Sequence, residues 1–381
     1  MEWKEYSLGD ISKLKYGKNV SAKLCKGPVP IFSGYRKIGT CNTINCKKNT
    51  VIVIARGAGG CGDVKLTKED CFLTNLSISV ELDKGICNAK WFYYNHLLNN
   101  LSFLNSGSAQ PQITIDSLSK YLIRIPPIII QRKIAGILSA LDSKIENNNK
   151  INANLEAQAQ ALFKSWFVDF TPFKDQPFVD SELGPIPQGW KVGKLGDLGE
   201  IVGGSTPSKS KPEYYTTHGI AWLTPKDLST SKAKFTSRGE IDITDEGYNS
   251  TSTKLMPRGS VLFSSRAPIG YLTIAKNEIC TNQGFKSLVP NGAGTGFIYY
   301  TLRHLTPQIE NRATGSTFKE ASATLMRSVE TIVPPTSILN KFEELLRPIL
   351  QFQEKNEEEN QRLAALRDTL LPKLMSGEIK L

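Results

Sequence analysis

The feature that most constrains this chain is an internal repeat, because two similar halves of a sequence fold into two similar structures. WKEYSLGDI at residues 3–11 recurs as WKVGKLGDL at residues 190–198. Downstream, the Pro-Pro pair at 126–127 recurs at 334–335. The separation grows from 187 to 208 residues between these anchors, so the second copy carries an insertion that the first copy lacks.

Each copy ends in a long segment with a seven-residue apolar repeat, which predicts a helix that packs against a partner helix. The segments run from about residue 128 to 170 and from about 336 to 376, and each follows a Pro-Pro pair, which is typical of a helix start. The other copy supplies the obvious partner. A short linker between the copies favours antiparallel packing, because a parallel pair needs a long return connection. A helix of about 40 residues is roughly 60 Å long.

The heptads predict which residues form the core of this helix pair, with a layer of asparagines at its centre. In that register Asn148 faces Asn360 and Asn152 faces Asn356, which fixes the register at some cost in stability. The alternative is that these asparagines only mark solvated turns. The predicted core comprises Ile134, Leu138, Leu141, Ile145, Asn148, Asn152, Leu155, Asn356, Asn360, Leu363 and Leu370.

Together these features predict an α+β chain with a pseudo-two-fold internal repeat. Two similar mixed α/β globular domains are separated by two long antiparallel helices that form a coiled coil. A stretch rich in Pro and Gly is the linker between the copies. The predicted segments are domain 1 at residues 1–125, spacer helix 1 at 126–171, the linker at 172–188, domain 2 at 189–333 and spacer helix 2 at 334–381.

The net charge of +11 is confined to the two predicted globular domains. Residues 1–125 carry 17 Lys and Arg against 9 Asp and Glu, and residues 189–333 carry 17 against 12. The first helix with its linker, and the second helix, each have one more acidic than basic residue. Two basic domains on a nearly neutral spacer suit a long polyanion, because Lys and Arg neutralise phosphates and release counterions. A scaffold that binds acidic proteins is the alternative.

Residues 51–62 read VIVIARGAGGCG and match the G-x-G-x-x-G spacing of a dinucleotide-binding loop. Such a loop needs a helix directly behind it, whose N-terminus holds the pyrophosphate. The residues that follow are too few and too weakly periodic for that helix, and the corresponding VLFSSRAPIG at 261–270 lacks the glycine pattern. A strand, a tight turn and a second strand are therefore predicted.

No arrangement of residues for catalysis stands out. The sequence has no G-x-x-x-x-G-K-[ST] loop, no H-E-x-x-H motif and no Asn-Pro-Pro-aromatic tetrapeptide of an adenine methyltransferase. Asp368 with Glu378 and Lys380 imitates a nuclease motif, but it lies at a helix end. The acidic run at 357–359 is interpreted as a solvated helix face, with docking of a basic partner as the alternative. Seven cysteines without a C-x-x-C pair indicate reduced thiols, and no metal is predicted.

The chain resembles the specificity subunits of type I restriction–modification systems over essentially its whole length. The similarity is carried by GSAQPQITIDSL, by the helical region that opens with PPIIIQRKIAGILSALDSKIENNNK, and by the tail LRDTLLPKLMSGEIKL. GWKVGKLGDL, GGSTPSKSKPEYY, WLTPKDLS and TGSTFKEAS add to it in the second half. The first half has no equivalent of WLTPKDL, so its contact loop is harder to place.

The resemblance implies a non-catalytic subunit with two target recognition domains, each of which reads one half of a gapped duplex DNA site. The helices would set the gap and dock two methyltransferase (modification) subunits. It implies S-adenosylmethionine, ATP and Mg²⁺ on those and on restriction or translocase subunits, and no cofactor in this chain. A self-contained DNA methyltransferase or nuclease is the alternative. Since no apolar run is long enough to cross a bilayer, a cytoplasmic location is expected.

Polar and basic residues in glycine-rich loops are the predicted DNA contacts. Arg or Lys pairs bidentately with guanine and Gln with adenine, while Ser and Thr hold phosphate. An ordinary surface side chain is the alternative for each, and an ion pair that braces the turn is a further alternative for Arg56 and Arg266. The predicted contacts are Lys18, Asn19, Tyr35, Arg36, Lys37, Arg56, Gln110 and Gln112 in domain 1, and Ser205, Thr206, Lys209, Lys211, Lys226, Arg266, Thr317 and Lys319 in domain 2.

Overall fold

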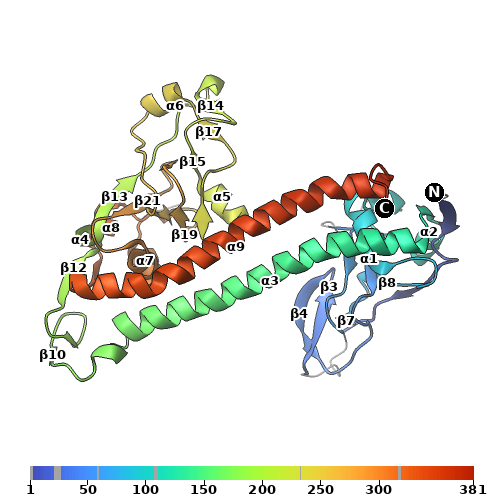
Figure 1. Cartoon of the computed structure of the whole chain (residues 1–381), viewed down its shortest axis with the longest axis horizontal. Coiled ribbons are helices and arrows are strands. Elements are labelled where there is room, and N and C mark those ends of the chain that lie inside the picture. The colour runs from blue at the N-terminus through green and yellow to red at the C-terminus, as the bar shows by residue number, and fades with distance from the viewer. Residues whose placement is uncertain (1–2, 21–26, 58–59, 107–109, 232, 316–318) are drawn as a thin grey trace. The chain divides into compact units, whose positions relative to one another are not determined.

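The computed structural model describes residues 3–20, 27–57, 60–106, 110–231, 233–315 and 319–381. The chain divides into two compact units: unit 1 comprises residues 1–146 and 360–381, and unit 2 comprises residues 147–359. Two long helices, α3 (Ile128–Phe167) and α9 (Thr336–Ser376), contribute a segment to each unit (Figure 1). The long helices that the heptads predict are therefore present.

A four-stranded antiparallel sheet forms the centre of unit 1, with the strand order β2-β8-β5-β6. All four residues of β5 are buried, and a strand of valine and isoleucine suits a position covered on both faces. β6 is the next strand after β5 and pairs antiparallel with it, so the two predicted strands are confirmed. Residues 55–63 connect them, which is longer than the predicted tight turn, and residues 58–59 lie outside the described part. A strand follows this connection, whereas a dinucleotide-binding loop needs a helix there. The strands are β2 (Ser12–Tyr16), β8 (Ser77–Leu82), β5 (Val51–Ile54) and β6 (Val64–Leu66).

Smaller elements complete the globular part of unit 1. A three-stranded sheet has the order β4-β3-β7, and β1 pairs antiparallel with β9, which leads into α3. The elements are β1 (Lys4–Ser7), β3 (Val29–Ser33), β4 (Arg36–Cys41), β7 (Phe72–Leu73), β9 (Leu122–Ile125), α2 (Ile115–Ser119) and the 3₁₀ helix η1 (Ser102–Leu104).

Helices close the core of unit 1. α1 (Ala89–Leu98) packs near β5 and β6, and Leu138 of α3 and Leu374 of α9 belong to the same buried apolar cluster. A polar contact also joins the two long helices in this unit, because Arg367 Nη1 donates to Asp142 Oδ1 at 2.7 Å. The apolar heptad positions at these ends of α3 and α9 therefore cover the globular part.

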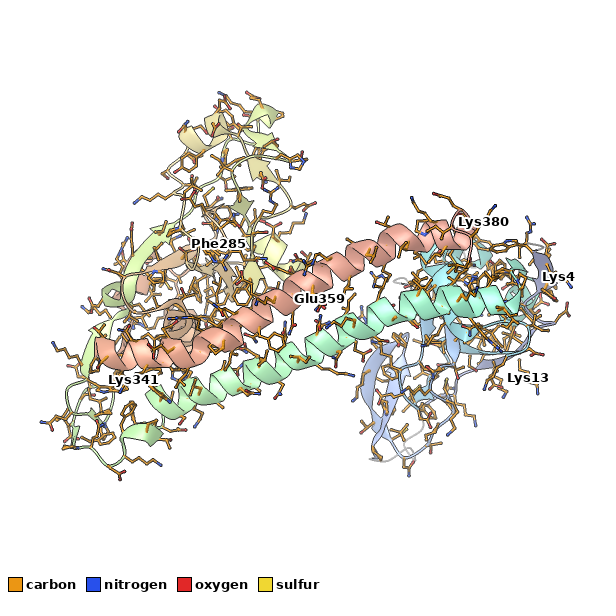
Figure 2. All side chains as sticks on the ribbon, in the orientation of Figure 1. Lys4, Lys13, Phe285, Lys341, Glu359 and Lys380 are labelled. Atoms are coloured by element: carbon orange, nitrogen blue, oxygen red, sulfur yellow. The ribbon has the colours of Figure 1, made fainter. Side chains whose placement is uncertain are left out.

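Unit 2 repeats this plan around a five-stranded sheet with the order β13-β21-β18-β19-β16. The first four strands follow the same order, at corresponding places in the sequence, as β2-β8-β5-β6 of unit 1. α7 lies against the sheet (Figure 1), and Phe285 is fully buried in the globular part (Figure 2). The elements are β13 (Gly199–Gly203), β21 (Lys286–Pro290), β18 (Val261–Ser265), β19 (Ile269–Ala275), β16 (Phe235–Thr236) and α7 (Thr295–Arg312).

Several short elements lie between β13 and β18, in a segment that is longer than its counterpart between β2 and β5 and therefore contains the insertion that the repeat indicates. Of these, β15 pairs parallel with β20, and β14 pairs antiparallel with β17. The elements of this part are η3 (Pro212–Tyr214), β14 (Tyr215–Thr216), β15 (Trp222–Leu223), α5 (Pro225–Thr230), β17 (Asp242–Ile243) and α6 (Asp245–Asn249). The rest of unit 2 holds η2 (Thr171–Phe173), β10 (Phe178–Val179), β11 (Ile186–Pro187), β12 (Lys191–Lys194), α4 (Leu195–Leu198), β20 (Cys280–Thr281), α8 (Ala323–Ser328) and β22 (Glu330–Val333).

Asparagines join α3 and α9 within unit 2. Asn356 Nδ2 donates to Asn152 Oδ1 at 2.8 Å, which is the pair that the heptad register predicts. Asn152 Nδ2 donates to the Gln353 carbonyl at 3.2 Å, and Asn148 Nδ2 donates to Glu359 Oε2 at 2.7 Å. Residue numbers rise along α3 as they fall along α9, so the two segments are antiparallel in this unit. The predicted pairing of Asn148 with Asn360 stays a prediction.

The interpretation of residues 357–359 as a solvated helix face is wrong. Glu357 accepts hydrogen bonds from the backbone N–H groups of Lys234 and Phe235 at 2.9 and 3.2 Å. Glu358 forms an ion pair with Lys276 at 2.5 Å, and Glu359 accepts from Asn148. A run of three acids turns its side chains to different faces of a helix, and here each face meets a donor from the same unit.

The described part of the chain contains no helix that is both long and apolar enough to cross a membrane. The cysteines in that part are all free thiols, and Cys25 lies outside it.

Candidate nucleic-acid interface

A cavity of about 750 Å³ in unit 2 brings together four predicted contact residues that are far apart in the sequence. Thr206, Lys209, Lys226 and Arg266 all line it. Two strand pairings explain part of this placement. β15 and β20 run parallel, so Lys226 after β15 and the loop after β20 lie at the same edge. β13 pairs antiparallel with β21, so the residues after β13 border the same loop. Asn282, Gln283 and Gly284 from the loop after β20 line the same cavity.

The cavity has an apolar wall of fixed rings. Trp222 and Tyr215 line it with ring centroids 5.9 Å apart in an edge-on arrangement. Trp222 Nε1 donates to the Ser205 carbonyl at 3.1 Å, and the Tyr215 hydroxyl donates to the Pro207 carbonyl at 2.6 Å. Both polar ends of the rings are thus used within the protein, which leaves their apolar faces and edges to the cavity.

The cavity is lined by the basic Lys209, Lys226 and Arg266 and by the acidic Asp227 and Glu240. The described ion pairs of Lys226 and Arg266 are exposed enough to exchange partners. Lys226 pairs with Glu240 at 2.9 Å, with 74% and 66% of the side chains exposed. Arg266 lies 3.5 Å from Glu320, with 36% and 38% exposed. Exposed pairs of this kind contribute little to stability, typically less than about 1 kcal/mol, so a phosphate or a base edge can replace the carboxylate.

The other predicted contacts of domain 2 do not line the cavity. Ser205 is held at its edge by the hydrogen bonds of its backbone to Thr281 and Trp222. Lys211 is exposed and donates to the Tyr214 hydroxyl at 3.0 Å, and the exposed Lys319 contacts the Glu310 carbonyl at 3.4 Å. Thr317 lies outside the described residues.

Arg56 occupies in unit 1 the place that Arg266 occupies in unit 2. Arg56 faces Gln112 in an isolated antiparallel bridge, and Arg266 faces Glu320 in the corresponding one. Arg266 also forms an ion pair with its bridge partner Glu320, as the bracing alternative predicts, whereas the bridge partner of Arg56 is the uncharged Gln112. Arg56 Nε is buried and has no hydrogen-bond partner among the described residues.

Lys18 reaches the same edge of the unit 1 sheet as Arg56. It follows β2, and its N–H donates to the Leu73 carbonyl at 3.0 Å. Ala55, directly before Arg56, donates to the Leu76 carbonyl at 2.8 Å, so both loops border the segment that leads into β8. Asn19 and Gln110 are exposed. Lys18, Asn19, Arg56 and Gln112 thus form a candidate contact edge.

Three of the predicted contacts lie in the hairpin between β3 and β4, and they do not share one environment. Arg36 and Lys37 are exposed, but Tyr35 packs inward. Its hydroxyl donates to the Leu66 carbonyl at 2.8 Å, its ring stacks on Phe32 with centroids 5.4 Å apart, and burial raises its pKa. The side chain of Tyr35 holds the hairpin in place.

Sequence reasoning missed Asn282 and Gln283. Amide side chains are suited to reading adenine, and Gln283 also accepts a hydrogen bond from the predicted contact Thr206. The signal is the polar segment TNQG between two strand-like runs at residues 281–284. Its proximity to Thr206 depends on the antiparallel pairing of β13 with β21, in which Gly203 faces Lys286. Local patterns do not predict that pairing.

Comparison with known proteins follows the same division into two halves. A family model described as the type I restriction modification DNA specificity domain matches residues 1–157 and 187–366. The specificity subunit of the type I restriction enzyme HindI from Haemophilus influenzae is 27% identical over 470 aligned residues, which cover 99% of this chain and 100% of that protein. The MjaIX specificity subunit from Methanocaldococcus jannaschii is 37% identical over 179 residues, or 44% of this chain and 41% of that one.

A solved structure shows the same fold. The S subunit of a type I restriction–modification system from M. genitalium superimposes with a TM-score of 0.68 at 20% identity, covering 98% of this chain and 96% of that chain. The resemblance noted from the sequence is confirmed, since the family model matches most of both halves. This chain belongs to the family of type I restriction modification DNA specificity domains.

Proposed function

We propose that this chain supplies the DNA sequence specificity of a type I restriction–modification enzyme, and that each globular part reads one half of a gapped duplex site. The observation that carries the proposal is the repeated sheet edge. In each unit an arginine, Arg56 or Arg266, follows the central strand and faces a polar residue of a distant loop. Basic residues hold phosphates, and bidentate arginine or amide side chains read bases.

The cavity in unit 2 supports this proposal with chemistry that suits nucleic acid. Its fixed aromatic rings offer apolar surface to a base or a thymine methyl group, and Lys209, Lys226 and Arg266 offer charge to the backbone. Asn282 and Gln283 also line the cavity and add the hydrogen-bond donors and acceptors of their side-chain amides.

We further propose that α3 and α9 act as an antiparallel coiled-coil spacer related by pseudo-two-fold symmetry, which sets the gap and docks two methyltransferase subunits. The proposal extends to a non-catalytic role for this chain. S-adenosylmethionine, ATP and Mg²⁺ then belong to those and to restriction or translocase partners. The antiparallel contacts of Asn152 with Gln353 and Asn356 support the spacer. The cytoplasmic location stays a prediction.

Selection of duplexes from a random library tests the function. The purified chain with its methyltransferase partner is expected to enrich a two-part motif with a fixed gap, with affinity that falls steeply as salt rises. Enrichment of acidic proteins without any DNA motif would favour the scaffold. Cleavage or methylation of plasmid by the chain alone, with Mg²⁺ and S-adenosylmethionine, would favour a self-contained enzyme.

A further inference from the structure

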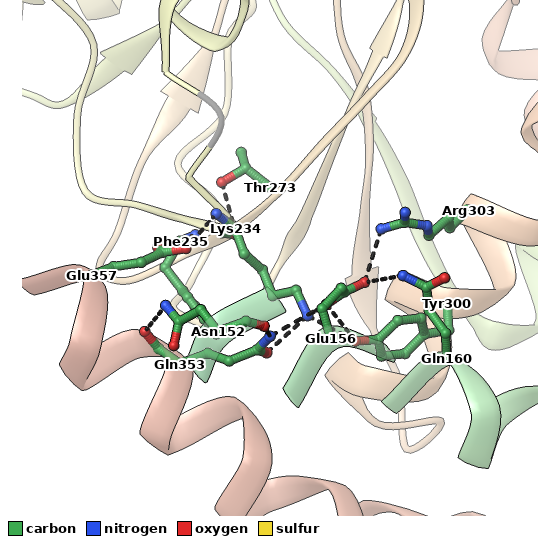
Figure 3. A network of polar contacts seen from close by, with 10 residues as sticks. All are labelled: Asn152, Glu156, Gln160, Lys234, Phe235, Thr273, Tyr300, Arg303, Gln353 and Glu357. Atoms are coloured by element: carbon green, nitrogen blue, oxygen red, sulfur yellow. Dashed lines mark hydrogen bonds and ion pairs between the residues drawn. The ribbon is translucent and has the colours of Figure 1, made fainter. Parts of the chain in front are cut away.

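Lys234 is a buried lysine whose ammonium group has a complete set of partners (Figure 3). Only 8% of its side chain is exposed. Its Nζ forms an ion pair with Glu156, and donates to the Tyr300 hydroxyl at 2.7 Å and to Gln353 Oε1 at 2.9 Å. An ammonium has three protons, so these three acceptors satisfy it.

The partners of Lys234 come from three different helices. Glu156 lies on α3, Gln353 on α9 and Tyr300 on α7 of the globular part. These four residues, called the Lys234 cluster below, therefore connect the globular part of unit 2 to both long helices at one level (Figure 3).

The backbone of Lys234 is held as firmly as its side chain. Its N–H donates to Glu357 of α9 at 2.9 Å, and its carbonyl accepts from Thr273 Oγ1 of β19 at 3.0 Å (Figure 3). The same carbonyl also accepts from Ile274 N at 2.8 Å. The segment at Lys234 thus lies between the sheet and α9, with no described polar group of this residue left for solvent.

Glu156 is charged in this environment. Burial raises its pKa, but the charge of Lys234 and the hydrogen bonds from Lys234, Gln160 and Tyr300 outweigh that effect and hold the pKa below its usual value. Arg303 Nη1 donates to Glu156 Oε1 at 2.9 Å and adds a second cation. The cluster is an ion pair, and its carboxylate is satisfied on both oxygens.

We infer that Lys234 is a positioning residue that fixes the level at which the globular part of unit 2 sits on α3 and α9, and thereby the gap length that the protein accepts in DNA. The inference rests on the proposed function. It concerns spacing alone, because none of the four residues lines the candidate interface cavity.

Lys234 would find no equivalent set of partners if the globular part shifted by one heptad along α3 and α9. One heptad along the antiparallel pair, the positions of Glu156 and Gln353 are taken by Phe163 and Leu346, which have no acceptor. In the other direction both positions are asparagines, at residues 149 and 360, and lack a carboxylate. A buried ammonium without its carboxylate is strongly unfavourable, so the cluster specifies one register.

Gap preference tests the inference. Duplexes that carry the two selected half-sites, with gaps from two base pairs shorter to two longer, are bound to the chain complexed with its methyltransferase partner. The wild type is expected to prefer one gap by at least tenfold. The double variant Lys234→Met with Glu156→Leu, which replaces the ion pair with apolar side chains of similar size, is expected to reduce that preference at least threefold while keeping both half-site sequences.

Arg258→Met is the matched control. Arg258 also joins the globular part to α9, through Glu354 at 2.9 Å, but 66% of its side chain is exposed. Its removal is expected to leave the gap preference within twofold of the wild type. An equal loss of gap preference in this control and in the double variant would overturn the inference. It would show that any contact between the globular part and α9 affects the gap, and that Lys234 has no special role.

The other possible results also test the inference. A folded double variant with wild-type gap preference overturns the inference and leaves the proposed function intact, whereas a wild type without sequence preference overturns both. If the double variant does not fold, Gln353→Leu removes one acceptor and keeps the ion pair. It is expected to reduce the gap preference at least twofold, and an unchanged preference would overturn the inference.

Discussion

Two arginines at equivalent places of the repeat differ in what neutralises them. Arg266 has Glu320 at 3.5 Å, whereas Arg56 faces the neutral Gln112 and keeps a buried Nε without a partner among the described residues. The net free energy gained on binding a base or a phosphate is smaller for an arginine that must first break an ion pair with a carboxylate than for an unpaired arginine.

Arg56→Ala is therefore expected to weaken binding more than Arg266→Ala, and each change should relax only one half-site. A bidentate contact to a base contributes about 1–3 kcal/mol of discrimination. Affinity for duplexes with single substitutions in each half-site measures both effects. If either variant relaxed both half-sites together, the two units would not read DNA independently.

His96 is a buried residue whose neutral form the fold requires. Nδ1–H donates to the Phe92 carbonyl at 2.8 Å, and Nε2 accepts from the Tyr121 hydroxyl at 3.2 Å. Burial lowers the pKa of His96 to about 4, although the hydrogen bond with Phe92 raises it slightly. The pKa of a histidine in an unfolded chain is about 6.5. The folded state thus binds fewer protons than the unfolded state between these values.

The contribution of His96 to the free energy of unfolding should therefore be fully present above about pH 6.5. It should be lost as the pH falls toward 4, by about 3 kcal/mol in total. Urea unfolding of the wild type and of His96→Gln, between pH 7.5 and 5, tests this expectation. The variant is expected to lose part of the pH dependence. The exposed His218, replaced by Gln, is the control, and an equal effect there would contradict the assignment to His96.

At the scale of elements, α7 begins without a side-chain cap of its own. Its N-cap is Gly294, and Glu343 of α9 instead accepts a hydrogen bond from Phe297 N at 2.7 Å. Gly294 has φ of +83°, and an added Cβ would lie 2.4 Å from the Glu343 carboxyl carbon, so the close approach requires glycine. A carboxylate at a helix N-terminus also interacts favourably with the helix dipole.

Glu343→Ala is expected to destabilise unit 2 by about 1–2 kcal/mol, since it removes a cap and a favourable charge together. Glu344→Ala, one residue further along α9 and exposed, should change stability by less than about 0.5 kcal/mol. Chemical unfolding of both variants gives the comparison. Equal effects would show that the carboxylate of Glu343 does not cap α7.

Elements with a regular pattern were predictable from the sequence, and contacts that depend on tertiary pairing were not. The heptads predict the long helices and the pair Asn152–Asn356, because a seven-residue period fixes which face meets a partner. Lys234 has the sequence context of a surface lysine, and only the fold brings it to Glu156. The acids at 357–359 failed as a prediction for the same reason, since their donors come from distant segments.

The candidate site shows the same limit. Thr206, Lys209, Lys226 and Arg266 were predicted from local composition and do share one cavity. Tyr35 has the same kind of loop sequence but faces inward, because the turn of the β3–β4 hairpin stacks its ring on Phe32 and its hydroxyl donates to the Leu66 carbonyl. Local patterns identify exposed loops, and strand pairing decides which of their side chains remain available.

At the scale of the whole molecule, the charge and the repeat agree. The excess of Lys and Arg lies in residues 1–125 and 189–333, which hold the two repeated sheets, whereas the segments that contain α3 and α9 are close to neutral. If α3 and α9 form the spacer that we propose, the distance between the two reading surfaces depends on their length and not on the residues that contact DNA.

Insertion of one heptad in each long helix is therefore expected to lengthen the accepted gap without changing either half-site. The insertions belong between Asp142 and Asn148 of α3 and between Glu359 and Arg367 of α9, because the polar contacts on either side then stay intact. Seven residues advance a helix by about 10 Å, which corresponds to about three base pairs of duplex. Selection from the random library reads both gap and half-sites. An insertion in α3 alone is the control and should abolish two-site binding, because the helices no longer match. An unchanged gap in the double insertion would show that the spacing of the DNA site is set outside α3 and α9.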